Sequence, residues 1–356
     1  MLRLGFLSNH NPFDKNAFSS TAHFMWRALS ENPSCSLQVL GKHRRPRPII
    51  DRFWRKAANA ALLDPSVLDR FDAIVSLVST NLVVKYGPLT HVPIIHCTDA
   101  TPGFLKEFYG YDIPDTAIEN ERRAYDCAKI ILFSSDFMRK RALAEFGELY
   151  APKMMSLPWG ANLETFPTVP PTKPPPNPLR LLFIGKDWAR KGGDIAVATT
   201  DELNRRGIAT ELHLVGTNAG SIGRGTTVVD HGYLNKNLRK DRLILEHLLN
   251  RSHFLLLPTR ADCTPMVLAE ANSYGIPVLT TNVGGIPSIV QEGRNGEMVS
   301  PDANAADYAD RLIALSSDQT EYEALSRSSF EHFRQHLTWS AWSDAIIGML
   351  EKRYTQ

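Results

Sequence analysis

Two charged segments contain residue types that could bind a phosphorylated ligand. In the first, residues 183–194 (FIGKDWARKGGD), an apolar run ends at Gly185 and is followed by Lys186, Arg190 and Lys191. Cationic side chains beside the amides of a beginning helix are what a diphosphate requires. The segment matches neither the GxxxxGK[ST] phosphate loop nor the GxGxxG dinucleotide pattern. Taken alone, the segment is more typical of a solvated basic turn than of a phosphate site.

The second segment, residues 255–271 (LLLPTRADCTPMVLAEA), predicts a strand, a short loop and then a helix. Thr264 suits the N-cap and Pro265 suits the first helical position, where a missing N–H is harmless. The amides of Met266 and Val267 would then face outwards at the positive end of the helix. Such a helix start is a second place where a phosphate could bind.

Asp262 and Glu270 are the acidic residues of this second segment. An aspartate before a helix is usually a cap, and a glutamate within a helix is usually solvated. Apolar and small residues flank Glu270, which favours burial, and a buried carboxylate needs a partner such as a pair of diol hydroxyls. Together, the two segments predict a ligand with both phosphates and sugar hydroxyls.

The elements that must position these residues are strands alternating with helices. Strands are expected at residues 2–8, 73–78, 93–96, 130–133, 179–185, 211–215, 253–257 and 277–280, and helices at 21–29, 194–206, 243–250 and 339–352. This alternation predicts parallel sheets covered on both faces, with functional groups in the loops after the carboxyl ends of the strands.

The chain length and a proline-rich segment together predict two domains. A chain of 356 residues exceeds one ordinary core. Residues 167–178 hold seven prolines in twelve positions, which indicates an extended linker. We therefore expect an α/β fold of two Rossmann-like doubly wound domains, at 1–166 and 179–336, that face each other across a cleft. Residues 337–356 are expected to form a helix that crosses back to the first domain.

The composition argues against several other classes of protein. The net charge of +2 does not suit a nucleic-acid binder. The cysteines at 35, 97, 127 and 263 include no CxxC pair, so neither a zinc site nor a disulfide framework is indicated. The N-terminal apolar run is too short for a signal peptide, and we expect a cytoplasmic protein.

Residues 42–56 (KHRRPRPIIDRFWRK) hold seven lysines and arginines against one aspartate, with interleaved apolar residues. This basic run could contact anionic lipid head groups, which would place the protein at the inner face of the membrane. An ordinary solvated loop and helix face explains it equally well.

The same motifs resemble those of retaining glycosyltransferases of the GT-B fold, family-4 type. Asp262 and Glu270 stand where that family has its E-x7-E pair, and residues 270–290 resemble its EAMAxGxPVVAT…GGxxE run. Further similarities lie in a phosphate loop (184–192), a base-contacting loop (229–234), the domain-junction motif IPNGVDxxxF (157–166) and a GxxG segment (293–299). Most of residues 130–300 takes part in the resemblance.

The resemblance implies a role for each of these positions. Glu270 would hold the ribose hydroxyls of the nucleotide, and Asp262 would hold hydroxyls of the transferred sugar. Lys186 and Lys191, with Arg190, would neutralise the departing diphosphate. The remaining implied contacts are the base loop at Tyr233, the helix start at Thr264, Pro265, Met266 and Val267, His96 beside the reacting sugar, and Ser19 and Ser20 in a loop near the phosphates.

The sequence departs from the family pattern at several of these positions. Asp262 replaces a glutamate, Lys186 an arginine, and Pro265 a glycine. Ser288 stands where many members have glutamate, and Ser19 and Ser20 replace paired glycines. The substitutions at Asp262 and Ser288 leave the identity of the donor sugar open.

The expected function is transfer of a hexose from a UDP- or GDP-linked donor to an acceptor hydroxyl, with retention, in surface polysaccharide or glycolipid synthesis. No DxD triplet occurs in the chain, so no metal is expected at the donor. The alternatives are an inverting GT-B transferase, a sugar-nucleotide epimerase and, from another class, a two-domain sugar-binding protein. The partners would be a nucleotide sugar and a glycan or lipid-linked acceptor.

Overall fold

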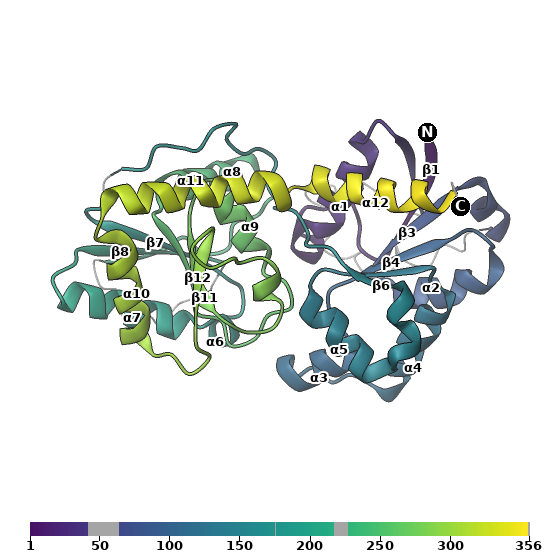
Figure 1. The fold of residues 1–356 in the computed structure, drawn as a ribbon, viewed down its shortest axis with the longest axis horizontal. Helices are drawn as coiled ribbons and strands as arrows, with labels where there is room; N and C mark the ends of the chain where they lie inside the picture. The colour runs from purple at the N-terminus through teal and green to yellow at the C-terminus, as the bar shows by residue number, and fades with distance from the viewer. Residues whose placement is uncertain (42–63, 175, 217–226, 355–356) are drawn as a thin grey trace. The chain divides into compact units, whose positions relative to one another are not determined.

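The structure, a computed structural model, describes residues 1–41, 64–174, 176–216 and 227–354 (Figure 1). The basic run at 42–56 lies outside the described residues. The chain divides into two compact units: Met1–Asn162 with Trp339–Gln356 form the first, and Leu163–Thr338 form the second.

The first unit is built on a parallel sheet with the strand order β2-β1-β3-β4-β5-β6. Its strands are β1 (Leu2–Ser8), β2 (Cys35–Leu40), β3 (Ala73–Leu77), β4 (Ile94–Thr98), β5 (Ile130–Phe133) and β6 (Met154–Ser156). The central strands β3, β4 and β5 are buried along their whole length. Continuous burial is typical of a parallel sheet whose two faces are both covered by helices.

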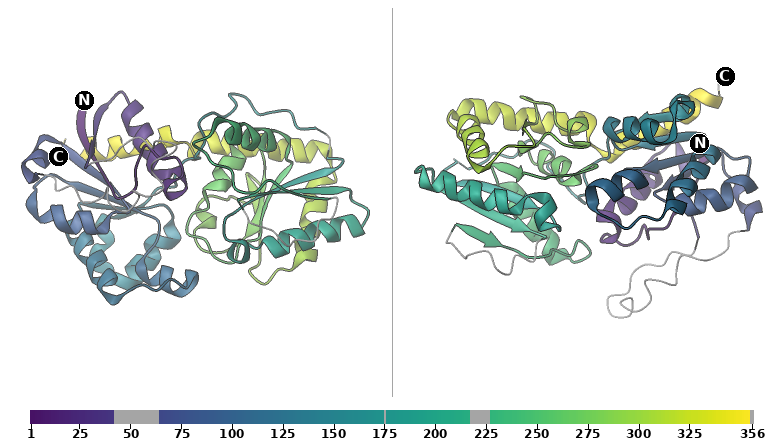
Figure 2. Two further views of the ribbon diagram at one scale, coloured as in Figure 1. Left: turned by 180° about the vertical axis from the view of Figure 1, so that it is seen from behind. Right: turned by 90° about the horizontal axis from the view of Figure 1, so that it is seen from below.

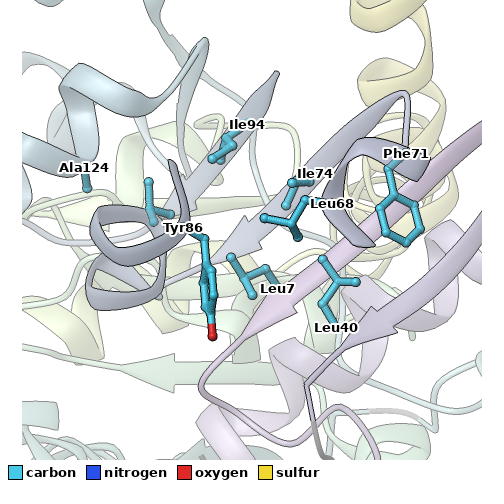
Figure 3. Packing of buried hydrophobic residues seen from close by; sticks show 9 residues of the cluster. Leu7, Leu40, Leu68, Phe71, Ile74, Tyr86, Ile94 and Ala124 are labelled. Atoms are coloured by element: carbon cyan, nitrogen blue, oxygen red, sulfur yellow. The ribbon is translucent and has the colours of Figure 1, made fainter. Parts of the chain in front are cut away.

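Helices cover both faces of this first sheet (Figures 1 and 2). They are α1 (Thr21–Glu31), α2 (Thr80–Tyr86), α3 (Pro102–Tyr109), α4 (Asp115–Cys127), α5 (Asp136–Phe146) and α12 (Trp339–Tyr354). Helix α12 packs against α1, and its Trp342, Ile346 and Leu350 are buried. Figure 3 shows the core between the sheet and α2, in which Leu7, Leu68, Ile74, Tyr86 and Ile94 meet.

The second unit repeats the plan with a parallel sheet of order β12-β11-β10-β7-β8-β9. Its strands are β7 (Leu179–Ile184), β8 (Thr210–Val215), β9 (Val228–Asp230), β10 (Phe254–Leu257), β11 (Val278–Thr281) and β12 (Gly296–Val299). Its helices are α6 (Trp188–Lys191), α7 (Gly193–Arg205), α8 (Arg239–Arg251), α9 (Met266–Asn272), α10 (Ala305–Ser316) and α11 (Gln319–His336). Helices α7 and α10 lie on one side of the sheet and α8, α9 and α11 on the other (Figure 1).

The strand order reverses between β1 and β3 in the first sheet and between β10 and β7 in the second. Right-handed crossovers place the helices on opposite faces on either side of such a point, which leaves a crevice beyond the carboxyl ends of the strands. The predicted fold class, two Rossmann-like doubly wound domains, is therefore confirmed. The reversal points mark where a ligand of each domain should bind.

The proline-rich segment at 167–178, predicted to link two domains, lies within the second unit. Lys173 explains this, because its Nζ donates to Leu249 O at 2.8 Å and Asn250 O at 3.2 Å at the end of α8. Pro174 O adds a 2.9 Å contact with His253 Nε2. Burial lowers the pKa of Lys173 to about 7. The prolines keep the segment out of helix and strand, and these contacts tie it to the unit that follows.

Histidines buried in the second unit should make its stability depend on pH. Burial lowers the pKa of His253 to about 4, and burial also lowers the pKa of His332 to about 4. The Nδ1 atom of His253 accepts the Arg180 amide at 2.8 Å, a bond that protonation of Nδ1 would abolish. A folded-state pKa below the unfolded value means that the unfolded chain binds more protons. Stability is therefore complete at neutral pH and is lost as the pH falls below the unfolded value.

We expect His253 alone to cost about 2 kcal/mol of unfolding free energy between about pH 7.5 and about pH 5. Denaturant unfolding at several pH values measures this slope. The His253→Gln variant should be less stable at neutral pH but should depend less on pH, whereas His91→Gln, at an exposed position, should behave like the parent. Equal pH slopes for the parent and His253→Gln would exclude this role for His253.

Candidate functional site

The loop after β7 and the loop after β10 meet at the reversal point of the second sheet. The first loop contains α6 and then Gly192, which has a φ of +73°. A Cβ at Gly192 would lie 1.9 Å from Pro258 O, at the end of β10. Only glycine fits this close approach, and its positive φ turns the chain into α7. The KGG sequence therefore brings the cations of the first loop beside the second loop.

Three of the predicted site residues come together across these loops. Lys191 Nζ donates to Asp262 Oδ2, and the Asp262 side chain is only 6% exposed. Arg190 Nη1 lies 4.0 Å from the same oxygen and donates to Ala261 O at 2.9 Å. Because the pair is almost buried, the carboxylate and the ammonium each need the other's charge until a ligand replaces one of them.

A second glycine fixes the backbone of Asp262. Gly284, with a φ of +54°, would place a Cβ 1.9 Å from Asp262 O. The next amide, of Gly285, donates to that oxygen at 3.1 Å. The paired glycines of the 270–290 motif thus hold the loop that carries Asp262.

The buried carboxylate of Glu270 has a protein partner that sequence reasoning missed. Glu270 lies in α9 and its side chain is 2% exposed. Its Oε1 accepts from Lys236 Nζ at 2.7 Å. Lys236 follows β9. In this segment, the sequence predicted only a base-contacting loop at Tyr233. The burial of Glu270 signals a partner, but no spacing in the sequence points to Lys236.

Lys186 and Tyr233 lie next to this pair. The Lys186 ammonium is 5.1 Å from the centre of the Tyr233 ring, which is close enough for a cation–π contact. Burial, and then the charge of Lys236, lower the pKa of Lys186. The candidate donor site thus has two parts. The first is Asp262 with Lys191 and Arg190. The second is the Glu270–Lys236 pair, with Lys186 and the Tyr233 ring beside it.

The start of α9 differs from the prediction by one residue. The helix begins at Met266 and Pro265 is its N-cap, so the assignment of Thr264 as N-cap and Pro265 as first helical residue was wrong. Pro265 has a ψ of 100°, which is extended rather than helical, while its carbonyl accepts the Leu268 amide at 3.1 Å. Met266 and Val267 remain the first two helical residues, as the phosphate-binding prediction requires.

In the first unit, the loop after β1 that carries Ser19 and Ser20 has a strained backbone. Phe18, Ser19 and Ser20 have φ values of 47°, 53° and 73°, and Val78, directly after β3, has 42°. Residues with side chains rarely adopt such values, and strain of this kind gathers at functional sites. Both loops follow the two strands that flank the reversal point. The left-handed conformation also explains why the family has glycines where Ser19 and Ser20 stand.

Asn162, in the junction motif 157–166, holds this loop in place. Its Nδ2 donates to Ser19 O at 2.8 Å and to Thr21 Oγ1 at 3.1 Å. Its Oδ1 accepts from Trp339 Nε1 at 3.0 Å. The side-chain amide of Asn162 therefore connects the strained loop, α1 and α12.

Replacing Ser19 by glycine should stabilise the protein by roughly 0.5–1 kcal/mol, because glycine relieves the left-handed strain at some cost in chain entropy. Ser19 is exposed and no side-chain packing is lost. Ser30→Gly, at an exposed position in α1, is the matched control and should destabilise by a similar amount. Denaturant midpoints measure both. A Ser19→Gly variant as unstable as Ser30→Gly would argue against strain at this position.

His96 lies on β4 and is completely buried. Its Nε2 is 3.6 Å from Glu121 Oε1, and its Nδ1 is 3.4 Å from Ser76 Oγ. Glu121 comes from α4, and its Oε2 accepts from Thr80 Oγ1 at 2.6 Å. Sequence reasoning did not identify Glu121. An acidic residue in a polar helical segment is usually solvated, and no spacing links Glu121 to His96. The contact between His96 and a sugar stays a prediction.

No set of three or more His, Cys, Asp or Glu side chains in the described part of the chain is arranged to hold a metal ion. No helix in that part is long and apolar enough to span a bilayer.

Residues 178–318 match the family model for glycosyl transferases group 1. The matched residues all lie in the second unit, which extends beyond the match at both ends. Spore coat protein SA of Bacillus subtilis is 30% identical over 182 residues, which is 48% of each chain. A putative colanic acid biosynthesis glycosyltransferase of Escherichia coli is 29% identical over 161 residues, 42% of this chain and 39% of the relative. The chain spans about half the length of the curated relatives it matches.

Several solved structures share the fold over the whole chain. Sucrose-phosphate synthase from Thermosynechococcus elongatus aligns with a TM-score of 0.71 and 14% identity over 100% of both chains. Anabaena HepE in complex with UDP aligns with a TM-score of 0.69 and 13% identity, over 99% of this chain and 100% of that one. At these identities the similarity establishes the GT-B fold.

Proposed function

We propose that this protein transfers a hexose from a UDP- or GDP-linked donor to an acceptor hydroxyl. The observation that carries the proposal is the charged cluster at the reversal point of the second sheet. Four cations (Lys186, Arg190, Lys191 and Lys236) lie there with three carboxylates (Asp187, Asp262 and Glu270). An excess of positive charge beside the start of α9 suits a diphosphate, and buried carboxylates suit the hydroxyls of two sugars.

Within this proposal each charged pair has a separate task. Lys186, Lys191 and Arg190 stabilise the diphosphate, together with the amides of Met266 and Val267. Asp262 accepts hydrogen bonds from hydroxyls of the transferred hexose. In doing so it gives up its contact with Lys191, whose ammonium then pairs with the diphosphate. Glu270 accepts from the ribose, and Tyr233 lies beside the base. The names of similar proteins support both nucleotides: HepE was solved with UDP-glucose, and a Mycobacterium tuberculosis relative is a GDP-mannose-dependent mannosyltransferase.

The first unit, residues 1–166 in the predicted division, would bind the acceptor. Ser19 and Ser20 would lie near the phosphates and His96 beside the reacting sugar. The acceptor would be a growing surface polysaccharide or a glycolipid, reached from the cytoplasm. The basic run 42–56 would then supply a contact with the anionic membrane.

We further propose that transfer retains the anomeric configuration. The bond between C1 of the hexose and the diphosphate oxygen breaks while the acceptor oxygen attacks C1 from the same face. The departing diphosphate, stabilised by Lys186 and Lys191, takes the acceptor proton. Inversion would instead need a base on the opposite face of the sugar.

Proton NMR of the first product formed from an α-linked donor tests retention. An α-linked product is expected, and it should also form in the presence of a chelator because no metal takes part. A β-linked product would identify an inverting transferase. Conversion of the donor into another nucleotide sugar would identify an epimerase, and binding without any reaction would identify a sugar-binding protein.

A further inference from the structure

The ion pair between Lys236 and Glu270 joins a nearly buried acid to a partly accessible base. The Glu270 side chain is 2% exposed and the Lys236 side chain 24%. Among the residues that the structure describes, Lys236 is the one whose side chain hydrogen-bonds this carboxylate. A carboxylate removed from water without a cation would take up a proton instead of staying ionised. Lys236 therefore supplies the positive charge that a carboxylate this deeply buried needs beside it.

The backbone around Lys236 is held so that its ammonium reaches Glu270. Arg242 Nη1, from the first turn of α8, donates to Lys236 O at 2.9 Å. On the preceding residue, the Asn235 amide donates to Asp241 Oδ2 at 2.8 Å. Both anchoring side chains, of Asp241 and Arg242, belong to α8. The helix therefore holds the backbone of Asn235 and of Lys236. The placement of Lys236 is thus built into the fold and does not depend on its long side chain alone.

The contact also orients the carboxylate. Lys236 Nζ donates to Oε1 at 2.7 Å, so its hydrogen bond to this carboxylate goes to one of the two oxygens. An ionised carboxylate with one oxygen fixed presents the other as an acceptor. A diol donating to it would form hydrogen bonds about twice as strong as those to a neutral acid.

We propose that Lys236 is a positioning residue for nucleotide recognition, which pairs with the buried Glu270 carboxylate and orients it to accept the ribose hydroxyls. This inference rests on the proposed function, in which Glu270 binds the ribose. It assigns Lys236 a role through Glu270. The competing assignment is direct contact between Lys236 and the phosphates, since Lys236 lies near Lys186.

A comparison of a nucleoside diphosphate with its 2′-deoxy form separates the two roles. Calorimetry with UDP and 2′-deoxy-UDP, or with GDP and 2′-deoxy-GDP, gives the preference of each variant for the ribose hydroxyl. The parent should prefer the ribonucleotide by about 10- to 100-fold. Lys236→Met should bind the ribonucleotide more weakly by a similar factor and bind the deoxy form almost unchanged, so the preference disappears.

Two further variants guard against a trivial loss of folding. Lys236→Arg keeps the cation and should keep most of the preference, and Lys240→Met, at an exposed site in α8, should behave like the parent. The double variant Lys236→Met with Glu270→Gln contains no unpaired buried charge and should bind no more weakly than Glu270→Gln alone.

Equal losses for ribo- and deoxynucleotide in Lys236→Met would overturn the proposal in favour of direct phosphate contact. An unchanged preference in that variant, or a double variant much weaker than Glu270→Gln, would overturn it as well. If the parent binds neither nucleotide, the proposed function fails. If the parent binds and the Lys236→Met variant binds equally well, only the role of Lys236 fails.

Discussion

Replacing Lys191 by alanine should lower turnover by roughly 100- to 1,000-fold with a smaller change in donor affinity. Negative charge on the diphosphate grows as the bond to the hexose breaks, so an ammonium beside it stabilises the transition state more than the bound donor. The structure places this ammonium on Asp262 in a nearly buried position. Steady-state kinetics with a saturating acceptor separates kcat from KM.

Two variants make the Lys191 result specific. Lys191→Arg keeps the charge and should recover part of the turnover, whereas Lys240→Ala removes an exposed lysine and should have no effect. A rise in KM with an unchanged kcat would mean that Lys191 binds donor and transition state equally, against the role proposed here.

Glu270→Gln should weaken binding of the donor and of the free nucleotide together, by about 10- to 100-fold. Glutamine has the shape of glutamate without its charge, so it accepts more weakly from the ribose and offers Lys236 a neutral acceptor in place of a carboxylate. The fold should persist, which melting temperatures check. Calorimetry that gives the parent affinity for this variant would exclude Glu270 from the nucleotide site.

The sequence was sufficient for much of the fold because local pattern and burial agree. Apolar runs such as 179–185 and 253–257 coincide with β7 and β10, which are buried on both faces. The same runs are followed by Lys186, Lys191 and Asp262, so the parallel arrangement brings these residues to one edge of the sheet. The position of these residues directly after strands therefore predicts that they lie close together.

What the sequence could not supply depends on contacts between distant segments. Lys236 meets Glu270 from 34 positions away, and Glu121 on α4 meets His96 on β4. No periodicity marks such pairs. The helix start at Met266 was missed because Pro265 satisfies the rule for a first helical residue but has an extended ψ. Lys173 fixes the proline-rich segment through bonds to α8, which its composition does not reveal.

The strained loop shows a different limit. Serine at positions 19 and 20 gives no sign of a left-handed backbone, since glycine is the usual signal for it. The bonds from Asn162 and the surrounding fold impose the conformation. Rules that expect glycine at a left-handed position therefore miss a position where serine adopts the same backbone conformation.

Ligand-induced stabilisation by a panel of nucleotide sugars tests the central claim most directly, because a ligand that binds only the folded state raises its melting temperature. The proposal predicts that a UDP- or GDP-linked hexose stabilises the parent protein in a concentration-dependent way. The same donor should stabilise Glu270→Gln much less and Lys240→Ala equally. If no UDP- or GDP-linked hexose shifts the melting temperature, or if Glu270→Gln responds like the parent, the second unit does not use this cluster to bind a nucleotide sugar.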